Sequence, residues 1–212
     1  MSSKRASRTR NWAERQRKDP YVQKAREGAF RSRAAFKLQQ LDQKERLLRP
    51  GMSVVDLGAA PGSWSQYAAC RVGPTGVVVA LDRLEMREIP GVHQIIGDFF
   101  DQRIIEELRQ TLGERPVDLV ICDLAPNLTG VSTIDQTAME RLVLAAVEFS
   151  QQHLGPKGVL VAKFFEGGQA GPLRRTIENV FSVSRVRKPE ASRAKSAEAY
   201  LVARDPVSVR TS

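Results

Sequence analysis

A glycine-rich turn follows an acidic residue at the end of an apolar segment in the first half of the chain. The segment 53–57 contains Asp56, and the turn 58–62 comes directly after it. An apolar run of this length is typical of a buried strand, and nucleotide-like ligands bind at the carboxyl ends of parallel strands. Gly58 and Gly62 would let the backbone approach such a ligand closely. A glycine-rich turn without a ligand is the alternative that this motif alone leaves open.

The spacing within the turn indicates which ligand it suits. A dinucleotide site has the pattern G-x-G-x-x-G, whereas this turn is G-A-A-P-G and lacks the Lys-Ser/Thr pair of a P-loop. Pro61 has no amide hydrogen to offer a phosphate. An uncharged or zwitterionic adenosine compound therefore fits better than a pyrophosphate, and S-adenosylmethionine is the candidate cofactor.

Two further acids follow the next two apolar segments. Asp82 lies 26 positions after Asp56, where a carboxylate can accept both ribose hydroxyls of a nucleoside. Asp98 could accept a hydrogen bond from the exocyclic amine of adenine, with Phe99 as a stacking neighbour. Each acid alone could instead cap a helix or form a turn, and Trp64, just after the glycine turn, could pack in a helix instead of contacting the cofactor.

A second group of residues could carry out chemistry. Asp123 follows the apolar segment 117–122, and Lys163 ends the apolar run 158–162. A lysine in that place could be an edge residue that extends its amine to solvent. If the sheet is wound as a parallel α/β sheet, however, Lys37, Asp123, Lys163 and Glu198 converge at one edge.

These residues need a scaffold of alternating strands and helices, which predicts one domain with a mostly parallel sheet covered on both faces. The expected strands are 53–57, 77–81, 93–96, 117–122, 159–164, 181–187 and 199–203. The expected helices are 32–47, 63–70, 102–112, 133–153 and 172–180, with a chain breaker at 155–158 before the fifth strand.

Positive charge is concentrated at the start of the chain. Residues 1–50 hold 15 Lys and Arg against 5 Asp and Glu, whereas the rest of the chain holds 18 against 19. This predicts a basic arm (1–30), a catalytic domain (31–206) and a short tail (207–212), with a polyanion such as RNA as partner. A solvated leader is the alternative for residues 1–20. A second basic run borders Glu198 and would extend the positive surface: Arg185, Arg187, Lys188, Arg193 and Lys195.

Other properties of the sequence concern location and metals. Residues 1–19 lack the apolar core of a secretory signal, and no run of about 18 apolar residues could cross a membrane, so we expect a cytoplasmic protein. Cys70 and Cys122 lie far apart without the spacing of a metal site or a disulfide framework. We expect no metal.

Four segments of the chain together resemble the FtsJ/RlmE family of 23S rRNA uridine 2'-O-methyltransferases, over about residues 21–204. They are SRAAFKL (32–38), DLGAAPGSWSQ (56–66), DLAPN (123–127) and SRAKSAE (192–198). The resemblance implies a seven-stranded Rossmann-like fold that uses S-adenosylmethionine. It also implies a catalytic tetrad of Lys37, Asp123, Lys163 and Glu198, and cofactor contacts from Gly62, Trp64, Asp82, Asp98 and Asp123.

The expected substrate is a uridine ribose in 23S rRNA, within the large ribosomal subunit, and we expect a monomeric enzyme. The difficult part of the reaction is to make the ribose 2'-hydroxyl nucleophilic and to align it with the methyl group. Lys163 is the candidate base and Lys37 the candidate neighbouring cation, because a lysine accepts a proton near neutral pH only when desolvation or a cation favours its neutral form. Asp123 and Glu198 would orient the lysines and the methyl group.

Three alternatives to this function remain at the level of sequence. The same reaction could act on a tRNA or an mRNA cap, or the fold could serve as a non-enzymatic ribosome assembly factor. Amino-group methylation of a base would call for an aromatic residue after the fourth strand, which the segment 123–126 lacks.

Overall fold

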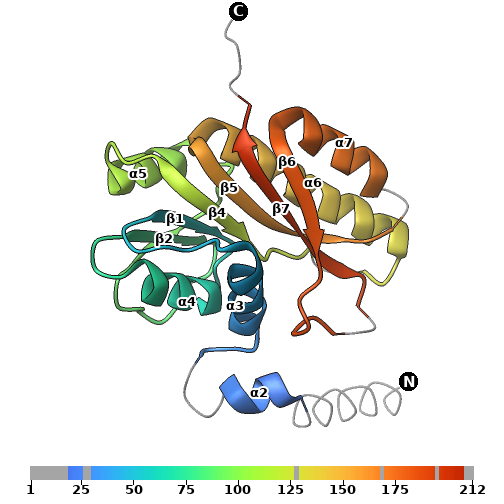
Figure 1. Ribbon diagram of the computed structural model, residues 1–212, viewed down its shortest axis with the longest axis horizontal. Helices are drawn as coiled ribbons and strands as arrows, with labels where there is room; N and C mark the ends of the chain where they lie inside the picture. Colours follow the sequence, from blue (N-terminus) through green and yellow to red (C-terminus); the bar gives the residue numbers. More distant parts are fainter. Residues whose placement is uncertain (1–18, 26–29, 127–128, 168–169, 194–195, 208–212) are drawn as a thin grey trace, which may run out of the picture.

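Seven strands form one sheet in the computed structural model, which describes residues 19–25, 30–126, 129–167, 170–193 and 196–207 (Figure 1). The order across the sheet is β3-β2-β1-β4-β5-β7-β6. Neighbouring strands are parallel except at β7, which is antiparallel to both β5 and β6. The strands are β1 (Ser53–Leu57), β2 (Val77–Asp82), β3 (Val92–Ile96), β4 (Val117–Cys122), β5 (Leu154–Phe165), β6 (Phe181–Arg187) and β7 (Glu198–Pro206). The expected fold class is confirmed.

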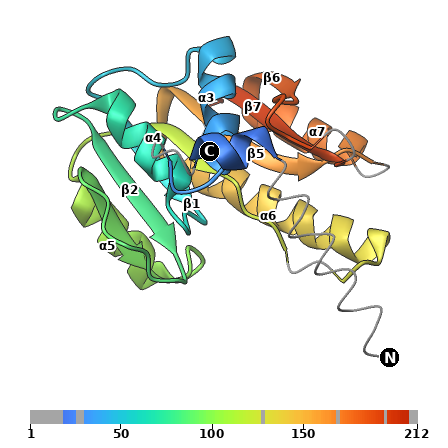
Figure 2. The ribbon, with the colours of Figure 1, turned by 90° about the horizontal axis from the view of Figure 1, so that it is seen from below.

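Helices cover both faces of the sheet, as Figures 1 and 2 show. One face packs against α3 (Ala34–Glu45) and α4 (Ser63–Val72), and the other against α5 (Gln102–Leu112), α6 (Ser132–His153) and α7 (Ala170–Val180). Because both faces are covered, the central strands are largely apolar, and all five residues of β1 are buried. Within the described ranges, no helix combines the length and apolar character needed to cross a membrane.

The start of β5 differs from the prediction. The strand begins at Leu154, so the expected chain breaker 155–158 lies inside it. Leu154 pairs with Val117, but the next pair along is Val159 with Leu119. An added Cβ at Gly158 would lie 2.7 Å from Cβ of Leu154, so the chain is folded tightly here. The glycines and the proline therefore disturb the pairing register instead of ending the strand.

The described end of the basic arm packs onto the domain. Helix α2 (Pro20–Lys24) is capped by Asp19, whose carboxylate accepts a hydrogen bond from the amide of Tyr21. The ring of Tyr21 lies 5.5 Å from that of Phe36, and its hydroxyl accepts a hydrogen bond from Gln40 on α3. Helix α2 thus contacts the domain although it precedes residue 31, where we expected the domain to begin. Residues 1–18 and 26–29 of the expected arm, and residues 208–212 of the expected tail, lie outside the described residues.

The parallel strands bring the candidate residues to one edge of the sheet. The carboxyl ends of β1, β2, β4 and β5 meet there because these strands share one direction. Strand β7 starts from the same edge in the opposite direction, and it pairs Glu198 with Phe165 and Tyr200 with Lys163. The edge therefore joins the glycine turn to the residues of the expected tetrad.

Candidate active site

The backbone amides of the glycine turn are satisfied within the protein. The amides of Gly58 and Ala59 donate to the carbonyl of Leu81, and that of Gly62 donates to Ala59. The amide of Ala60 donates to the Asp82 carboxylate at 2.9 Å, and Pro61 has none. In a phosphate-binding loop the amides point at the ligand. This turn therefore lacks the donors that a pyrophosphate requires, in agreement with the expectation from its spacing.

A cavity of about 700 Å³ opens beside the glycine turn, within the range of about 300–1,000 Å³ that is usual for small-molecule sites. Three carboxylates and two arginines contribute to a lining that is otherwise largely apolar. The lining includes Gly58, Asp82, Arg83, Leu84, Asp98, Phe99, Phe100, Asp123, Leu124 and Arg141. Apolar walls with a few acceptors suit a nucleoside, whose ring stacks while its hydroxyls and amine donate hydrogen bonds.

Asp82 and Asp98 both line this cavity, and both also hold turns in place. Asp82 accepts hydrogen bonds from the amides of Ala60 and Leu84, one on each oxygen. Asp98 accepts one from the amide of Phe100 and lies 3.3 Å from the Arg83 guanidinium. Each carboxylate oxygen can accept a second hydrogen bond. The structural and the ligand-binding interpretations of these acids are therefore compatible.

Gly58 and Gly62 adopt backbone conformations that favour glycine, with φ of +73° and +93°. A Cβ at Gly58 would lie 2.0 Å from Leu124, which lines the cavity. Gly62 precedes α4 and lies outside the cavity lining. Trp64 is also outside it: the indole donates a hydrogen bond to the carbonyl of Ala34, and its ring lies 5.6 Å from that of Tyr200. Its surroundings are those of a packed helix residue.

The four residues of the expected tetrad form two lysine–carboxylate pairs. The Lys163 amine donates hydrogen bonds to the main-chain carbonyl of Asp123 at 2.6 Å and to its carboxylate at 3.0 Å. The Lys37 amine lies 2.7 and 2.9 Å from the two carboxylate oxygens of Glu198. The Lys163 side chain is 7% exposed, so it does not extend to solvent. The structure thus brings these residues together in an ion-pair cluster made up of Lys37, Asp123, Lys163, Glu198 and Tyr200.

Tyr200 joins the two pairs, although the sequence did not single it out. It is fully buried, and its hydroxyl donates to the Asp123 carboxylate at 2.7 Å. Burial raises its pKa well above the usual value, and the carboxylates of Asp123 and Glu198 add to the rise. The Lys37 amine lies 5.8 Å from the centre of its ring. A tyrosine in an apolar strand is typical of a core residue, and no local pattern would have distinguished it.

Glu198 remains ionised in this setting. Burial alone would raise its pKa, but the Lys37 ammonium and the Ser192 hydroxyl outweigh that effect and lower the pKa below its usual value. The Ser192 hydroxyl lies 2.9 Å from the second carboxylate oxygen. Because the negative charge persists, Lys37 keeps a fixed partner across the gap between α3 and β7.

Asp56 lies beneath the glycine turn and has no cationic partner among the described residues. It is 1% exposed, and its carboxylate accepts a hydrogen bond from the Ser65 hydroxyl at 2.6 Å. Burial raises its pKa to about 7, and the charges of Asp123 and Asp82 add to this rise. Through Ser65, the carboxylate contacts the first turn of α4.

The fold and this site define a methyltransferase, and comparison with known proteins identifies the family. A family model for FtsJ-like methyltransferases matches residues 30–206. The chain belongs to the FtsJ-like methyltransferase family, as expected from the sequence segments.

Close relatives in sequence carry one common name. The chain is 49% identical to the Ribosomal RNA large subunit methyltransferase E of Alkalilimnicola ehrlichii, over 95% of this chain and 96% of the relative. It is 46% identical to the protein of the same name from Dechloromonas aromatica, over 95% of this chain and 98% of the relative. The similarity therefore extends over nearly the whole length of both relatives.

Two solved structures share the fold of this chain. A ribosomal RNA methyltransferase from Plasmodium falciparum matches with a TM-score of 0.77 and 26% identity, over 85% of this chain and all of that one. A fibrillarin from Aeropyrum pernix in complex with S-adenosyl-L-methionine matches with a TM-score of 0.55 and 16% identity, over 82% of this chain and 74% of that one. The second likeness concerns the fold alone.

Proposed function

We propose that the protein transfers a methyl group from S-adenosylmethionine to the ribose 2'-hydroxyl of a uridine in 23S rRNA of the large ribosomal subunit. The relatives named for large-subunit RNA methylation support the substrate class. The observation that carries the proposal is the position of Asp123, which both lines the cavity and accepts hydrogen bonds from Lys163 and Tyr200. The cofactor cavity and the ion-pair cluster thus share one carboxylate.

The cavity suits the cofactor in its charge and its shape. S-adenosylmethionine supplies a methyl group already activated on a sulfonium centre. Asp82 and Asp98 would bind its ribose hydroxyls and adenine amine, and Phe99 would pack against the ring. Asp123 would place a negative charge beside the sulfonium. Gly58 and Gly62 would shape the turn that bounds the cavity, with Trp64 packed behind it.

The ion-pair cluster would remove the proton and hold the ribose. The Lys163 amine has two acceptors, the carbonyl and the carboxylate of Asp123. A neutral amine has two N–H groups, so it keeps both hydrogen bonds while its lone pair is free to accept the proton of the 2'-hydroxyl. Lys37, held by Glu198, would orient the same ribose through its remaining donors.

The proposal includes the cellular compartment, the oligomeric state and the form of the substrate. The protein would act in the cytoplasm as a monomer on the assembled large subunit or its RNA. Because the cavity and the cluster are both complete in one chain, no second copy is required for the chemistry.

Methylation of defined substrates tests this proposal. Large ribosomal subunits from cells lacking the gene would be incubated with the protein and radiolabelled S-adenosylmethionine, and methylated positions would be mapped in the RNA. We expect label on the 2'-oxygen of a uridine in 23S rRNA. Tests with tRNA and capped mRNA separate the alternative substrates. Label on a base, label in those RNAs alone, or no transfer at all would contradict the proposal.

A further inference from the structure

A seam runs between helix α3 and the connection from β6 to β7. The side-chain oxygen of Gln40 on α3 accepts a hydrogen bond from the amide of Ala191 at 2.8 Å, which closes the seam at one point. Two hollows line this seam. The first, of about 260 Å³, is bounded by Arg33, Ala34, Lys37, Arg193, Ser196 and Glu198. The second, of about 450 Å³, includes Lys44, Arg187, Lys188 and Glu190.

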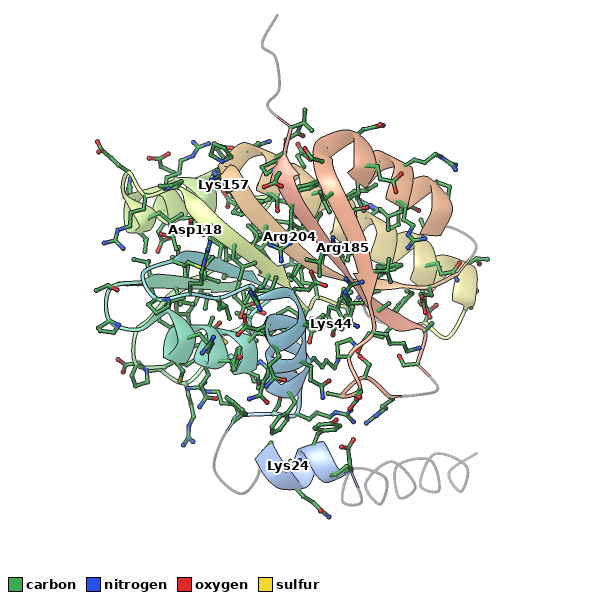
Figure 3. The ribbon with its side chains drawn as sticks, in the orientation of Figure 1. Lys24, Lys44, Asp118, Lys157, Arg185 and Arg204 are labelled. Atoms are coloured by element: carbon green, nitrogen blue, oxygen red, sulfur yellow. The ribbon has the colours of Figure 1, made fainter. Side chains whose placement is uncertain are left out.

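The basic residues around this seam fall into two groups that the sequence did not distinguish. Arg185, Arg187 and Arg204 all lie within 4 Å of the buried Glu45 carboxylate, and Arg204 also donates to the main-chain carbonyl of Glu45. Figure 3 labels Arg185 and Arg204 near the carboxyl end of α3, where Glu45 lies. These arginines fasten the helix to β6 and β7. They are therefore less available to an external anion than the sequence suggested.

Three other cationic side chains of the seam are available to bind an external anion. Lys44, Lys188 and Arg193 are exposed, and none forms an ion pair within the described part of the chain. Lys188 donates a hydrogen bond to the main-chain carbonyl of Ser196, which fixes its position without cancelling its charge. Lys195, the remaining member of the predicted basic run, lies outside the described residues. Arg193 thus lies in the first hollow, and Lys44 and Lys188 lie in the second, where they outnumber the carboxylate of Glu190.

The seam has the length and the chemistry to hold an RNA backbone. Lys37 and Lys44 are separated by seven residues of helix, about 10 Å at 1.5 Å per residue, which is about the rise of three stacked nucleotides. Among the residues that line the two hollows there is no aromatic ring on which a base could stack. Contacts here would therefore involve phosphates, which position a strand without reading its sequence.

We propose that a single-stranded RNA segment adjoining the target nucleotide runs along this seam. Arg193 binds a phosphate in the first hollow, beside Lys37 and Glu198, and Lys44 and Lys188 bind phosphates in the second. The inference rests on the proposed function, because it takes the ribose at the ion-pair cluster as the start of the strand. It adds a direction: the RNA leaves the cluster along α3 toward its carboxyl end.

A charge-matched pair of variants tests the seam. The seam variant carries Lys44→Gln, Lys188→Gln and Arg193→Gln. The control carries Arg109→Gln, Arg115→Gln and Lys157→Gln, which are exposed residues at the opposite edge of the sheet. Both lose three positive charges, so they share any effect of net charge. Binding of a short labelled single-stranded RNA would be measured over a salt series, together with calorimetry of S-adenosylmethionine.

Each phosphate contact contributes about 0.7 to the slope of log affinity against log salt for single strands. The seam variant should therefore lose about 2 units of slope. If the wild type and the variant bind equally at 1 M salt, the variant should bind about 100-fold more weakly than the wild type at 0.1 M salt. The control should keep the wild-type slope, and both should bind the cofactor normally. Equal slopes for the seam variant and the control would overturn the inference.

The design separates this inference from the proposed function. Methyl transfer to large-subunit RNA by the wild type tests the function, whatever the slopes are. If the wild type methylates RNA and the seam variant keeps its slope, the strand follows another path and the seam proposal is wrong. If the seam variant alone loses slope but the wild type transfers no methyl group, the seam binds RNA but the proposed function is wrong.

Discussion

The cofactor cavity and the ion-pair cluster meet at Asp123, yet they are built from different parts of the chain. The cavity is shaped by turns, and its acids accept hydrogen bonds from amides two to 22 residues away. The cluster joins residues 40 to 161 positions apart, from α3, β4, β5 and β7. Local backbone structure therefore forms the first region, and the packing of distant elements forms the second.

The two regions also differ in how they hold buried charge. In the cluster, each carboxylate has a lysine within 3.0 Å. Beneath the glycine turn, Asp56 is buried with the hydroxyl of Ser65 as its side-chain partner. A buried acid without a cation favours its neutral form, whereas a paired acid favours its charged form. The comparison indicates that Glu198 in the cluster keeps its charge, whereas Asp56 under the glycine turn favours its neutral form.

The largest expected effect concerns the base in the cluster. Lys163→Ala should lower the rate of methyl transfer by about 10² to 10⁴, the usual contribution of a general base. Lys163→Arg keeps the positive charge beside Asp123 but cannot release a proton near neutral pH, so it should be comparably slow. Single-turnover assays measure both, with Lys157→Arg as the matched control. Near-normal rates for Lys163→Arg would exclude proton abstraction by this residue.

The buried acid beneath the glycine turn, Asp56, should affect the pH dependence of stability. The pKa of Asp56 is raised from 3.8 to about 7 in the folded state, which therefore binds more protons than the unfolded state between these values. This contribution to the free energy of unfolding is complete below about pH 4 and is lost as the pH rises to about 7.

The variant Asp56→Asn should lack this loss. Its stability relative to the wild type should increase by about 2 to 3 kcal/mol between pH 5 and pH 8, at about 1.4 kcal/mol per unit. Urea denaturation at the two pH values measures the difference. A relative stability that does not change with pH would show that Asp56 is ionised throughout.

Two glycines offer a matched test of the turn beside the cavity. Gly58 and Gly73 have similar φ values, +73° and +66°, so an alanine is strained at both. A Cβ at Gly58 would lie 2.0 Å from Leu124, whereas a Cβ at Gly73 would contact nothing within 4 Å. Gly58→Ala should weaken cofactor binding by about tenfold or more, about 1.4 kcal/mol, and Gly73→Ala should not. If calorimetry finds equal cofactor affinities for the two variants, the turn at Gly58 does not form part of the cofactor site.

The smallest expected effect concerns the residue that joins the two pairs. Tyr200→Phe keeps the ring beside Lys37 but removes the hydroxyl that donates to Asp123. One hydrogen bond contributes about 0.5 to 1.5 kcal/mol, so the methylation rate should fall by less than about tenfold. The rate at saturating substrate measures it. A loss as large as that of Lys163→Ala would mean that Tyr200 takes part in the proton transfer itself.

The sequence predicted much of the cavity because its determinants are local. The strand bounds at β1, β4 and β6 match the prediction, and Asp82 ends β2 while Asp98 lies two residues after β3. The prediction that the turn does not bind a pyrophosphate also depended on a local fact, the missing amide hydrogen of Pro61. By contrast, the irregular start of β5 depends on pairing with β4, which no local pattern encodes.

The cluster could be predicted only in part. Its four charged residues were recognised from their places in the expected strands and helix and from the family resemblance, but their pairing depends on how α3 and β7 pack. Tyr200 was missed because it looks like any other core residue of an apolar strand. The basic run 185–195 was treated as one surface, and the buried Glu45 that neutralises part of it was not anticipated.

The separate duties of the two regions can be tested by one measurement, the single-turnover rate as a function of cofactor concentration for Asp82→Ala and Lys163→Ala. Asp82→Ala should weaken cofactor binding by about 1 to 3 kcal/mol, the cost of an unpaired buried partner. Saturating cofactor should then restore its rate to within about tenfold of the wild type. Lys163→Ala should remain at least about 10² slower at every cofactor concentration. Restoration of both variants, or of neither, would contradict the division between cavity and cluster.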